Sequence, residues 1–361
     1  MKIAVSAAET SGDLIGSKLV QALKAQDNTI QIYGLAGDKM KASGCEQLWD
    51  QKQVDVMGFT EVLKKLPALL RLRSAMAGYL IADKPDVFIG IDAPDFNFAL
   101  EKRLKSHGVK TIHYISPSVW AWRQSRIKKI KQSSDLILCV FPFEVDFYHK
   151  HQQKALFVGH PLAQSLTPRV NHTPGKKILL MPGSRSSEVK RLLPEMIEAV
   201  RLLKKHDSQL DFNLALANQS LYDWALEQVK NTGINLSVGD AHDRIRQSDL
   251  VLVASGTASL EVALIGVPMV VVYKLSTLSY WIASALIKSP YISLPNVIAG
   301  KSLVPELIQK QANGVSIAQH ALAILQSDNQ SLVQEFANIH AQLKCNTDEI
   351  SIQAIMDLVN E

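Results

Sequence analysis

Residues 250–261 read Leu-Val-Leu-Val-Ala-Ser-Gly-Thr-Ala-Ser-Leu-Glu, and they show the strand–turn–helix unit from which the fold is predicted. The apolar run Leu250–Ala254 predicts a buried strand, the small residues after it a tight turn, and the apolar residues from Leu260 onward a helix. The free N–H groups and the dipole of a first helical turn attract anions, and small side chains let a phosphate come close. Glu261, one turn into the helix, is expected to meet ribose hydroxyls beside that phosphate. The residues expected to hold a diphosphate are Ser255, Gly256, Thr257 and Ala258.

The rest of the chain alternates short apolar runs with helical patterns, which is typical of parallel, doubly wound sheets. In the first half the expected strands are Lys2–Ala7, Gln31–Leu35, Val87–Ile91, Thr111–Ile115 and Leu136–Val140, and the expected helices include Asp13–Gln26 and Phe98–His107. After a polar stretch over Thr167–Lys177, the expected elements are Lys177–Met181, Glu188–His206, Asp211–Ala217, Leu221–Thr232 and Leu250–Ala254.

This pattern predicts an α/β protein with two Rossmann-like, doubly wound domains and a cleft between them. The expected domains are residues 1–166 and 167–331. The remaining segment, residues 332–361, has a helical pattern and is expected to pack across domains or onto another subunit. A chain of 361 residues is natural for two domains.

Composition narrows the classes of function. The chain is 47% hydrophobic and 20% charged, which is ordinary for a globular protein and excludes disorder. A net charge of +5 is too weak to indicate nucleic acid as a partner, whereas phosphorylated substrates and anionic membrane surfaces agree with it. Cys45, Cys139 and Cys345 are isolated, so we expect neither a metal site nor disulfides, and a reducing cytoplasm.

Targeting and membrane segments are not predicted. The apolar run near the N-terminus is too short for a secretory signal and is followed at once by acids. Residues 262–287 are apolar but contain Gly, Pro and several Ser. They are therefore expected to form a helix end, a strand over Met269–Tyr273 and a second helix rather than a spanning segment.

Acidic residues follow two of the expected strands. Glu9 lies in a loop of small residues before a helix, and the loop either caps that helix or is shaped around a sugar or phosphate. Asp92 and Asp95 follow Val87–Ile91, and capping the next helix needs only one of them. A carboxylate at such a strand end can take a proton from an incoming hydroxyl. We therefore expect Asp92 to be a general base, with Asp95 as a second candidate.

A second turn of small residues follows the strand Lys177–Met181. It contains Gly183, Ser184 and Arg185, and the Arg guanidinium can donate two hydrogen bonds to phosphate oxygens. It is not the phosphate loop of kinases, because the Gly-Lys-Ser/Thr ending is missing, and the first strand carries no Gly-x-Gly-x-x-Gly dinucleotide pattern.

Two further segments are unusual. The first includes Ser116, Trp120, Trp122 and Arg123, which either fill the core or bind an anionic, apolar substrate. The second, residues 57–73, mixes many Leu with four cations. It is either an ordinary helix pair around Pro67 or an amphipathic surface in a membrane interface. In the second case, the residues that enter the bilayer are Leu66, Leu69 and Leu70.

The sequence resembles the bacterial lipid-A-disaccharide synthase family over almost the whole chain. The most specific motif that the chain shares with this family is Ser-Pro-Ser-Val-Trp-Ala-Trp-Arg at residues 116–123. The other shared motifs are Glu-Thr-Ser-Gly-Asp at 9–13, Gly-Ile-Asp-Ala-Pro-Asp-Phe-Asn at 90–97, Pro-Gly-Ser-Arg at 182–185, Ala-Ser-Gly-Thr-Ala at 254–258 with Glu261, and Ser-Leu-Pro-Asn at 293–296. One difference is Ala8, where we expect a Gly beside Glu9.

The resemblance implies an inverting glycosyltransferase of the two-domain GT-B fold. The implied donor is UDP-2,3-diacylglucosamine and the implied acceptor 2,3-diacylglucosamine 1-phosphate. The implied products are the β(1→6) disaccharide 1-phosphate and UDP. Members of the family are peripheral at the cytoplasmic face of the inner membrane, dimeric through an exchanged C-terminal element, and need no metal or other cofactor.

The resemblance also suggests roles for the candidate residues. Asp92 takes the proton of the acceptor 6-hydroxyl, and the Ser255–Ala258 turn with Arg185 stabilises the departing UDP in place of a metal. Glu261 and Asn296 hold the ribose and the uracil, and Glu9 shapes the sugar site.

Two alternatives remain open from the sequence. The first alternative is that the chain is another GT-B enzyme, such as a UDP-N-acetylglucosamine epimerase or the transferase that completes the peptidoglycan lipid intermediate. The second is that it is a non-catalytic protein that binds nucleotide sugar or lipid. An epimerase needs neither an amphipathic surface nor an acceptor, and a binding protein has no use for a carboxylate at the end of a strand.

Overall fold

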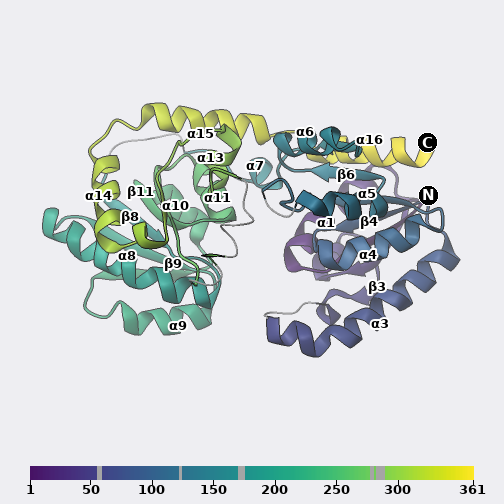
Figure 1. Cartoon of the computed structure of the whole chain (residues 1–361), viewed down its shortest axis with the longest axis horizontal. Helices are drawn as coiled ribbons and strands as arrows, with labels where there is room; N and C mark the ends of the chain where they lie inside the picture. The colour runs from purple at the N-terminus through teal and green to yellow at the C-terminus, as the bar shows by residue number, and fades with distance from the viewer. Residues whose placement is uncertain (55–58, 122–123, 170–174, 277–279, 282–288) are drawn as a thin grey trace. The chain divides into compact units, whose positions relative to one another are not determined.

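The computed structural model describes residues 1–54, 59–121, 124–169, 175–276, 280–281 and 289–361, with the backbone alone over 59–65. It divides into two compact units. The first comprises Met1–Pro161 with Leu343–Glu361, and the second comprises Leu162–Gln342. Each unit is a parallel sheet flanked by helices (Figure 1).

The sheet of the first unit has the strand order β3-β2-β1-β4-β5-β6-β7, and neighbouring strands are parallel. The strands are β1 (Lys2–Ala7), β2 (Gln31–Ala36), β3 (Glu46–Asp50), β4 (Val87–Ile91), β5 (Lys110–Tyr114), β6 (Leu136–Cys139) and β7 (Ala155–Phe157). The α-helices are α1 (Thr10–Gln26), α2 (Asp38–Ala42), α3 (Phe59–Asp83), α4 (Pro94–Lys105), α5 (Ile127–Ser133), α6 (Pro142–Lys150) and α16 (Thr347–Asn360). The short 3-10 helices are η1 (Gln51–Gln53) and η2 (Gln124–Arg126).

The sheet of the second unit has the order β10-β9-β8-β11-β12-β13, again parallel throughout. The strands are β8 (Lys177–Met181), β9 (Asp211–Leu216), β10 (Ile234–Val238), β11 (Leu250–Ala254), β12 (Met269–Tyr273) and β13 (Glu306–Ile308). The helices are α7 (Pro161–Ser165), α8 (Ser186–His206), α9 (Gln219–Gln228), α10 (Ala241–Gln247), α11 (Thr257–Ile265), α13 (Leu294–Ala299), η3 (Gln309–Gln311), α14 (Gly314–Leu325) and α15 (Gln330–Leu343).

The strand order of each sheet reverses between two central strands, β1 and β4 in the first unit and β8 and β11 in the second. In open α/β sheets, ligands bind outside the carboxyl ends of the strands at such a reversal. These strands are apolar, and every residue of β4 and β11 is buried, because helices cover both faces of a parallel sheet. The loops that follow the four strands carry Glu9, Asp92, the 183–185 turn and the 255–258 turn.

The predicted fold class is confirmed, but four strands were not predicted. These are β3, β7, β10 and β13, which lie at the edges of the two sheets. They are three to five residues long and only partly buried, so their apolar pattern is weak. Another difference concerns Pro67, since α3 is one helix with Pro67 inside it and not a pair of helices. Pro67 is exposed, so water can bond to the backbone carbonyl that the proline leaves unpaired.

The ends of the expected domains also differ from the two units. The first unit ends at Pro161 rather than at residue 166, and Leu343–Glu361 returns to it. The helical pattern over 332–361 is two helices, α15 and α16, and α16 packs on α1 and β5 (Figure 1, yellow). The helix expected after Met269–Tyr273 falls largely on residues outside the described ranges, and so does part of the Thr167–Lys177 stretch.

Candidate functional site

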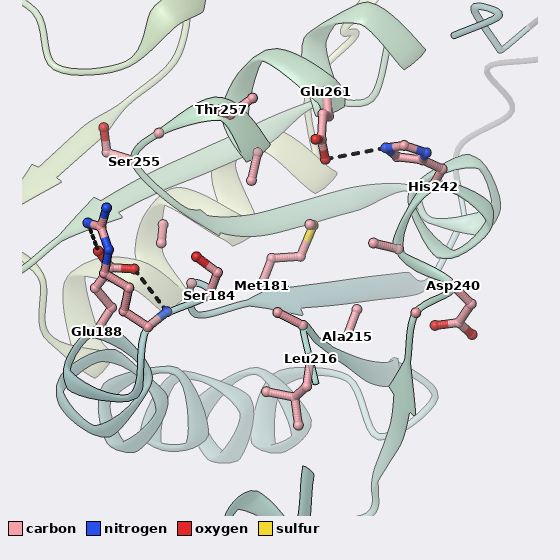
Figure 2. A pocket seen from close by; sticks show the side chains of 18 of the residues that line it. Met181, Ser184, Glu188, Ala215, Leu216, Asp240, His242, Ser255, Thr257 and Glu261 are labelled. Carbon is pink, nitrogen blue, oxygen red and sulfur yellow. Dashed lines mark hydrogen bonds and ion pairs between the residues drawn. The ribbon is translucent and has the colours of Figure 1, made fainter. Parts of the chain in front are cut away.

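A pocket of about 760 Å³ lies at the carboxyl ends of the central strands of the second unit. Its walls come from segments 181–188, 215–217, 239–246 and 254–261, which follow β8, β9, β10 and β11 (Figure 2). The walls include Gly183, Ser184, Arg185, Ser255, Gly256, Thr257, Ala258 and Glu261. Most of the residues that the sequence predicted for a UDP-sugar site therefore border one pocket.

The N-terminus of α11 forms one side of the pocket. Gly256 precedes the helix with a φ of 144°, a conformation that residues with a side chain rarely adopt, and no side chain caps the helix there. The first N–H groups of α11 thus remain available to an anion, reinforced by the helix dipole. The Ser255 hydroxyl donates a hydrogen bond to the Ile292 carbonyl at 2.8 Å. Ser255 thereby ties the turn to the segment before α13.

The turn after β8 forms a second side. Gly183 has a φ of 116°, and a Cβ there would come within 2.7 Å of a Glu188 carboxylate oxygen. The Arg185 side chain is 79% exposed, and its guanidinium lies 3.1 Å from the Glu188 carboxylate (Figure 2). An exposed pair of this kind contributes little to stability. Arg185 can therefore exchange this partner for a bound phosphate at small cost.

Glu261 faces His242 across the pocket, with 3.5 Å between Oε2 and Nε2 (Figure 2). Burial raises the pKa of Glu261, and the nearby His242 opposes that rise. His242, Asp240 and Arg246 also line the pocket and were not predicted from the sequence. These residues follow β10, an edge strand that was not predicted because its apolar pattern is weak. Without that strand, nothing in the sequence placed them at a strand end.

Asn296 is not among the residues that line this pocket. It is fully buried on α13, where its amide nitrogen donates to the Val304 carbonyl and to Glu306 Oε1, both at 2.9 Å. Its amide oxygen accepts the N–H groups of Leu303 and Val304. The uracil contact expected of the Asn296 side chain does not agree with this placement, because both polar groups of its amide are engaged by residues 303–306.

In the first unit, Asp92 directly follows β4, at the point where the strand order reverses. Its side chain is half-buried, and Oδ2 accepts a hydrogen bond from the Ser11 hydroxyl at 3.2 Å. Glu9 is exposed and precedes α1 as its N-cap residue. Asp95 lies in the first turn of α4, where it is exposed and ion-paired with Arg126. Asp92 is therefore the half-buried carboxylate of the three, whereas Asp95 is engaged on the surface.

Ser116 and Trp120 belong to a cluster against α6, in which Ser116 is buried and Trp120 only partly buried. The Ser116 hydroxyl lies 3.0 Å from the Tyr148 hydroxyl, and the Trp120 ring packs edge-on against Phe143. Glu144 lies in the same cluster, and burial raises its pKa to about 8, although a hydrogen bond from the Phe141 N–H opposes the rise. Trp122 and Arg123 lie outside the described residues.

The candidate lipid-contacting residues on α3 separate into two groups. The side chains of Leu66 and Leu70 are exposed, at 42% and 46%, and their spacing of four puts them on one face. Leu69 is partly buried and packs against the core that includes Met76 and Leu80. Of the three, Leu66 and Leu70 are therefore the ones placed to enter an apolar surface.

Metal clusters and spanning helices are both missing from the described residues. That part of the chain contains no group of three or more His, Cys, Asp or Glu residues that could hold a metal ion. Among the helices described, none combines the length and the apolar character needed to cross a bilayer.

Comparison with solved structures shows the class of this fold. MnaA of S. aureus, in a co-structure with UDP, aligns with a TM-score of 0.65 at 14% identity, covering 100% of this chain and 98% of that one. UDP-GlcNAc 2-epimerase from Neisseria meningitidis, bound to UDP-GlcNAc, aligns with a TM-score of 0.64 at 12% identity, covering 99% of this chain and 100% of that one. At such identities the likeness concerns the fold alone, which is that of GT-B glycosyltransferases and the related epimerases.

Sequence comparison gives the family. The sequence-family model described as lipid-A-disaccharide synthetase matches residues 3–355. The lipid-A-disaccharide synthase of Photobacterium profundum is 40% identical over 375 residues, covering 100% of this chain and 99% of that protein. The chain belongs to the lipid-A-disaccharide synthase family. It is therefore a glycosyltransferase of lipid A biosynthesis, and its substrates are a nucleotide sugar and a lipid phosphate acceptor.

Proposed function

We propose that this enzyme condenses UDP-2,3-diacylglucosamine with 2,3-diacylglucosamine 1-phosphate, giving the β(1→6) tetraacyl disaccharide 1-phosphate and UDP. One observation carries the proposal. The pocket of the second unit combines an uncapped helix N-terminus with a carboxylate one turn further along the same helix. Such a site fits a diphosphate with its ribose attached.

In the proposed reaction, the acceptor 6-hydroxyl oxygen forms a bond to the anomeric carbon of the donor. The hydroxyl proton passes to the Asp92 carboxylate, and the bond between the anomeric carbon and the diphosphate breaks. The bonding electrons leave with UDP, and the configuration at the anomeric carbon inverts. Because Asp92 is only half-buried, its carboxylate can be reached by a substrate hydroxyl and can take that proton.

We propose that the charge developing on UDP is stabilised by the N–H groups of α11 and by Arg185 without a metal ion. Fixed dipoles aimed at a developing charge often contribute more to catalysis than any other effect. Glu261 would accept hydrogen bonds from the ribose hydroxyls, and Glu9 would shape the sugar site. This part of the proposal predicts that turnover is unchanged by EDTA and falls sharply in Arg185→Ala.

The decisive experiment combines the purified enzyme with both diacylated substrates and identifies the product by mass spectrometry. Asp92→Asn should lower turnover by about 10²–10⁴-fold, because it removes the proton acceptor. Calorimetry should show unchanged UDP affinity in the same variant. Near-normal turnover of folded Asp92→Asn would refute the base assignment, and epimerisation of the donor without acceptor would refute the transfer itself.

The resemblance to the family supports two further proposals. The enzyme attaches to the cytoplasmic face of the inner membrane, with Leu66 and Leu70 entering the bilayer, and it forms a homodimer through residues 332–361. Light scattering of the purified enzyme tests the second proposal. A monomeric mass at assay concentrations would contradict it.

A further inference from the structure

Asn97 is a buried polar residue that holds the turn carrying Asp92. It lies in the first turns of α4 and is completely inaccessible to solvent. Its amide nitrogen donates to the Asp92 carbonyl at 2.8 Å, with longer contacts to the carbonyls of Ser6 and Ile91 at 3.2 and 3.3 Å. Its amide oxygen accepts the Ser6 hydroxyl at 2.7 Å. One side chain therefore joins the ends of β1 and β4 to the start of α4.

The turn that Asn97 holds has an unfavourable backbone. Asp92 has a φ of 54° and Ala93 a φ of 43°, so two consecutive residues other than glycine are left-handed. Each such residue costs about 1–2 kcal/mol. A conformation of this kind persists only where its surroundings enforce it.

The hydrogen bonds around the turn supply that enforcement. The Asp92 N–H donates to the Tyr114 carbonyl of β5 at 2.9 Å, while the Asp92 carbonyl accepts from Asn97. The Asn97 N–H in turn donates to the Ala93 carbonyl at 3.0 Å. Because both peptide groups of Asp92 are held, the direction in which its Cα–Cβ bond leaves the backbone is held as well.

The position of α4 is set by a second buried group one turn along the helix. Glu101 is fully buried and accepts hydrogen bonds from His113 at 2.7 Å and from Ser134 at 2.5 Å. Gly90 makes room for both polar residues, because a Cβ there would lie 2.1 Å from Glu101 Oε1 and 2.9 Å from the Asn97 Cβ. The helix thus comes close enough to β4 for the Asn97 amide to reach the Asp92 carbonyl.

We propose that Asn97 is a positioning residue, which holds the Asp92–Ala93 turn left-handed and so aims the Asp92 carboxylate at the acceptor hydroxyl. This inference rests on the proposed role of Asp92 as the base. A displacement of about 1 Å in a reacting group can cost on the order of 10²-fold in rate. An Asn97 side chain that only filled the core would affect stability and leave the rate per folded molecule unchanged.

The test replaces Asn97 by Ser, which is too short to reach the Asp92 carbonyl. We expect kcat per folded molecule to fall on the order of 10²-fold. The affinity for UDP should not change, because the residues lining its expected pocket all belong to the second unit. Thr111→Val is the matched control, since it removes a fully buried hydroxyl and its hydrogen bond from β5 of the same unit without touching the turn. It should lower stability and leave kcat intact.

A double-mutant cycle with Asp92→Asn separates positioning from a general defect. If Asn97 acts through Asp92, adding Asn97→Ser to Asp92→Asn should change the residual turnover less than about 2-fold, since effects of groups that act as a unit are not additive. A full further loss in the Asp92→Asn background, or unchanged kcat in folded Asn97→Ser, would overturn the inference. Near-normal turnover of Asp92→Asn alone would instead refute the base assignment.

Asn97→Ser combined with Ala93→Gly provides the measurement if Asn97→Ser alone does not fold. Glycine adopts the left-handed conformation without steric cost, so the strain that Asn97 opposes is relieved. The double variant should fold with kcat below the native value, because a glycine at position 93 fits the left-handed conformation but holds the turn less rigidly than the Asn97 hydrogen bonds do. A well-folded double variant with native kcat would show that Asn97 does not aim Asp92, and would overturn the proposal.

Discussion

The carboxylate of Glu261 and the imidazole of His242 lie 3.5 Å apart and face one another across the pocket of the second unit. Glu261 belongs to the helix whose N-terminus is the expected anion site, whereas His242 belongs to the segment after an edge strand. Burial raises the pKa of Glu261, so this carboxylate takes up a proton at a higher pH than an exposed glutamate does.

Glu261→Gln should weaken UDP binding by about tenfold at pH 8, because hydrogen bonds to a charged group contribute about 1.5–3 kcal/mol. The raised pKa means that Glu261 gains a proton as the pH falls, so native affinity should fall toward acidic pH. The affinity of Glu261→Gln should change less over the same range. Titration calorimetry with UDP at pH 6 and pH 8 measures both. Equal affinities of the two proteins at pH 8 would show that Glu261 does not contact the nucleotide.

Gly256→Ala should weaken UDP binding about tenfold or more, since a residue with a side chain at this backbone conformation costs about 1–3 kcal/mol. An added Cβ meets nothing within 4 Å, so the effect is on the backbone and not a clash. Gly78→Ala is the control, because position 78 lies in α3 with equally open space. It should stabilise the first unit by a few tenths to about 1 kcal/mol and leave UDP affinity unchanged. Native affinity in Gly256→Ala would contradict the role of this turn.

Leu66→Ser with Leu70→Ser should reduce recovery on anionic lipid vesicles and leave thermal stability close to native, because both side chains are exposed. Leu69→Ser should do the reverse, since Leu69 packs on the core. Its partial burial predicts destabilisation of about 1–3 kcal/mol with little change in vesicle binding. Vesicle sedimentation and thermal unfolding distinguish the two. Unchanged sedimentation of the double variant would contradict a membrane contact through these residues.

Glu144→Gln should make the free energy of unfolding of the first unit depend less on pH. Burial raises the pKa of Glu144 from 4.5 to about 8, so between these values the folded state binds more protons than the unfolded state. The free energy of unfolding therefore falls as the pH rises through this window, by up to about 1.4 kcal/mol per unit. Glutamine stays neutral and should gain stability over the native protein from pH 5 to pH 8. Urea unfolding followed by circular dichroism measures the difference, with the exposed Glu227→Gln as control. A constant difference across this range would contradict the raised pKa.

The sequence could predict the central strands and the turns that follow them. β4 and β11 are apolar throughout because they are covered on both faces, and their ends carry Asp92 and the Ser255 turn. Edge strands such as β10 lack that signal, and the residues after them, including His242, were missed for this reason. The topology then explains why the predicted turns lie close together, since each pair follows strands that are neighbours in a sheet.

Properties that depend on distant partners could not be predicted. Asn296 has the composition of a ligand-binding residue, but its amide is engaged by residues 303–306, which the sequence does not identify as neighbours. Leu66, Leu69 and Leu70 are equivalent in a sequence, and only packing on the core distinguishes Leu69. Asn97 likewise had no role of its own in the motif at residues 90–97, because its contacts with Ser6 and Asp92 depend on how β1, β4 and α4 pack.

The return of Leu343–Glu361 to the first unit has a consequence for biosynthesis. The ribosome must synthesise all of residues 162–342 before α16 exists to cover α1. Throughout that interval the nascent first unit exposes the surface on which residues such as Ile352 and Ile355 are later buried. Binding of a ribosome-associated chaperone, or of another nascent chain, to that surface would compete with the later docking of α16. Slowing elongation within residues 162–342 should therefore lengthen the protease-sensitive period of a unit whose own strands were completed much earlier.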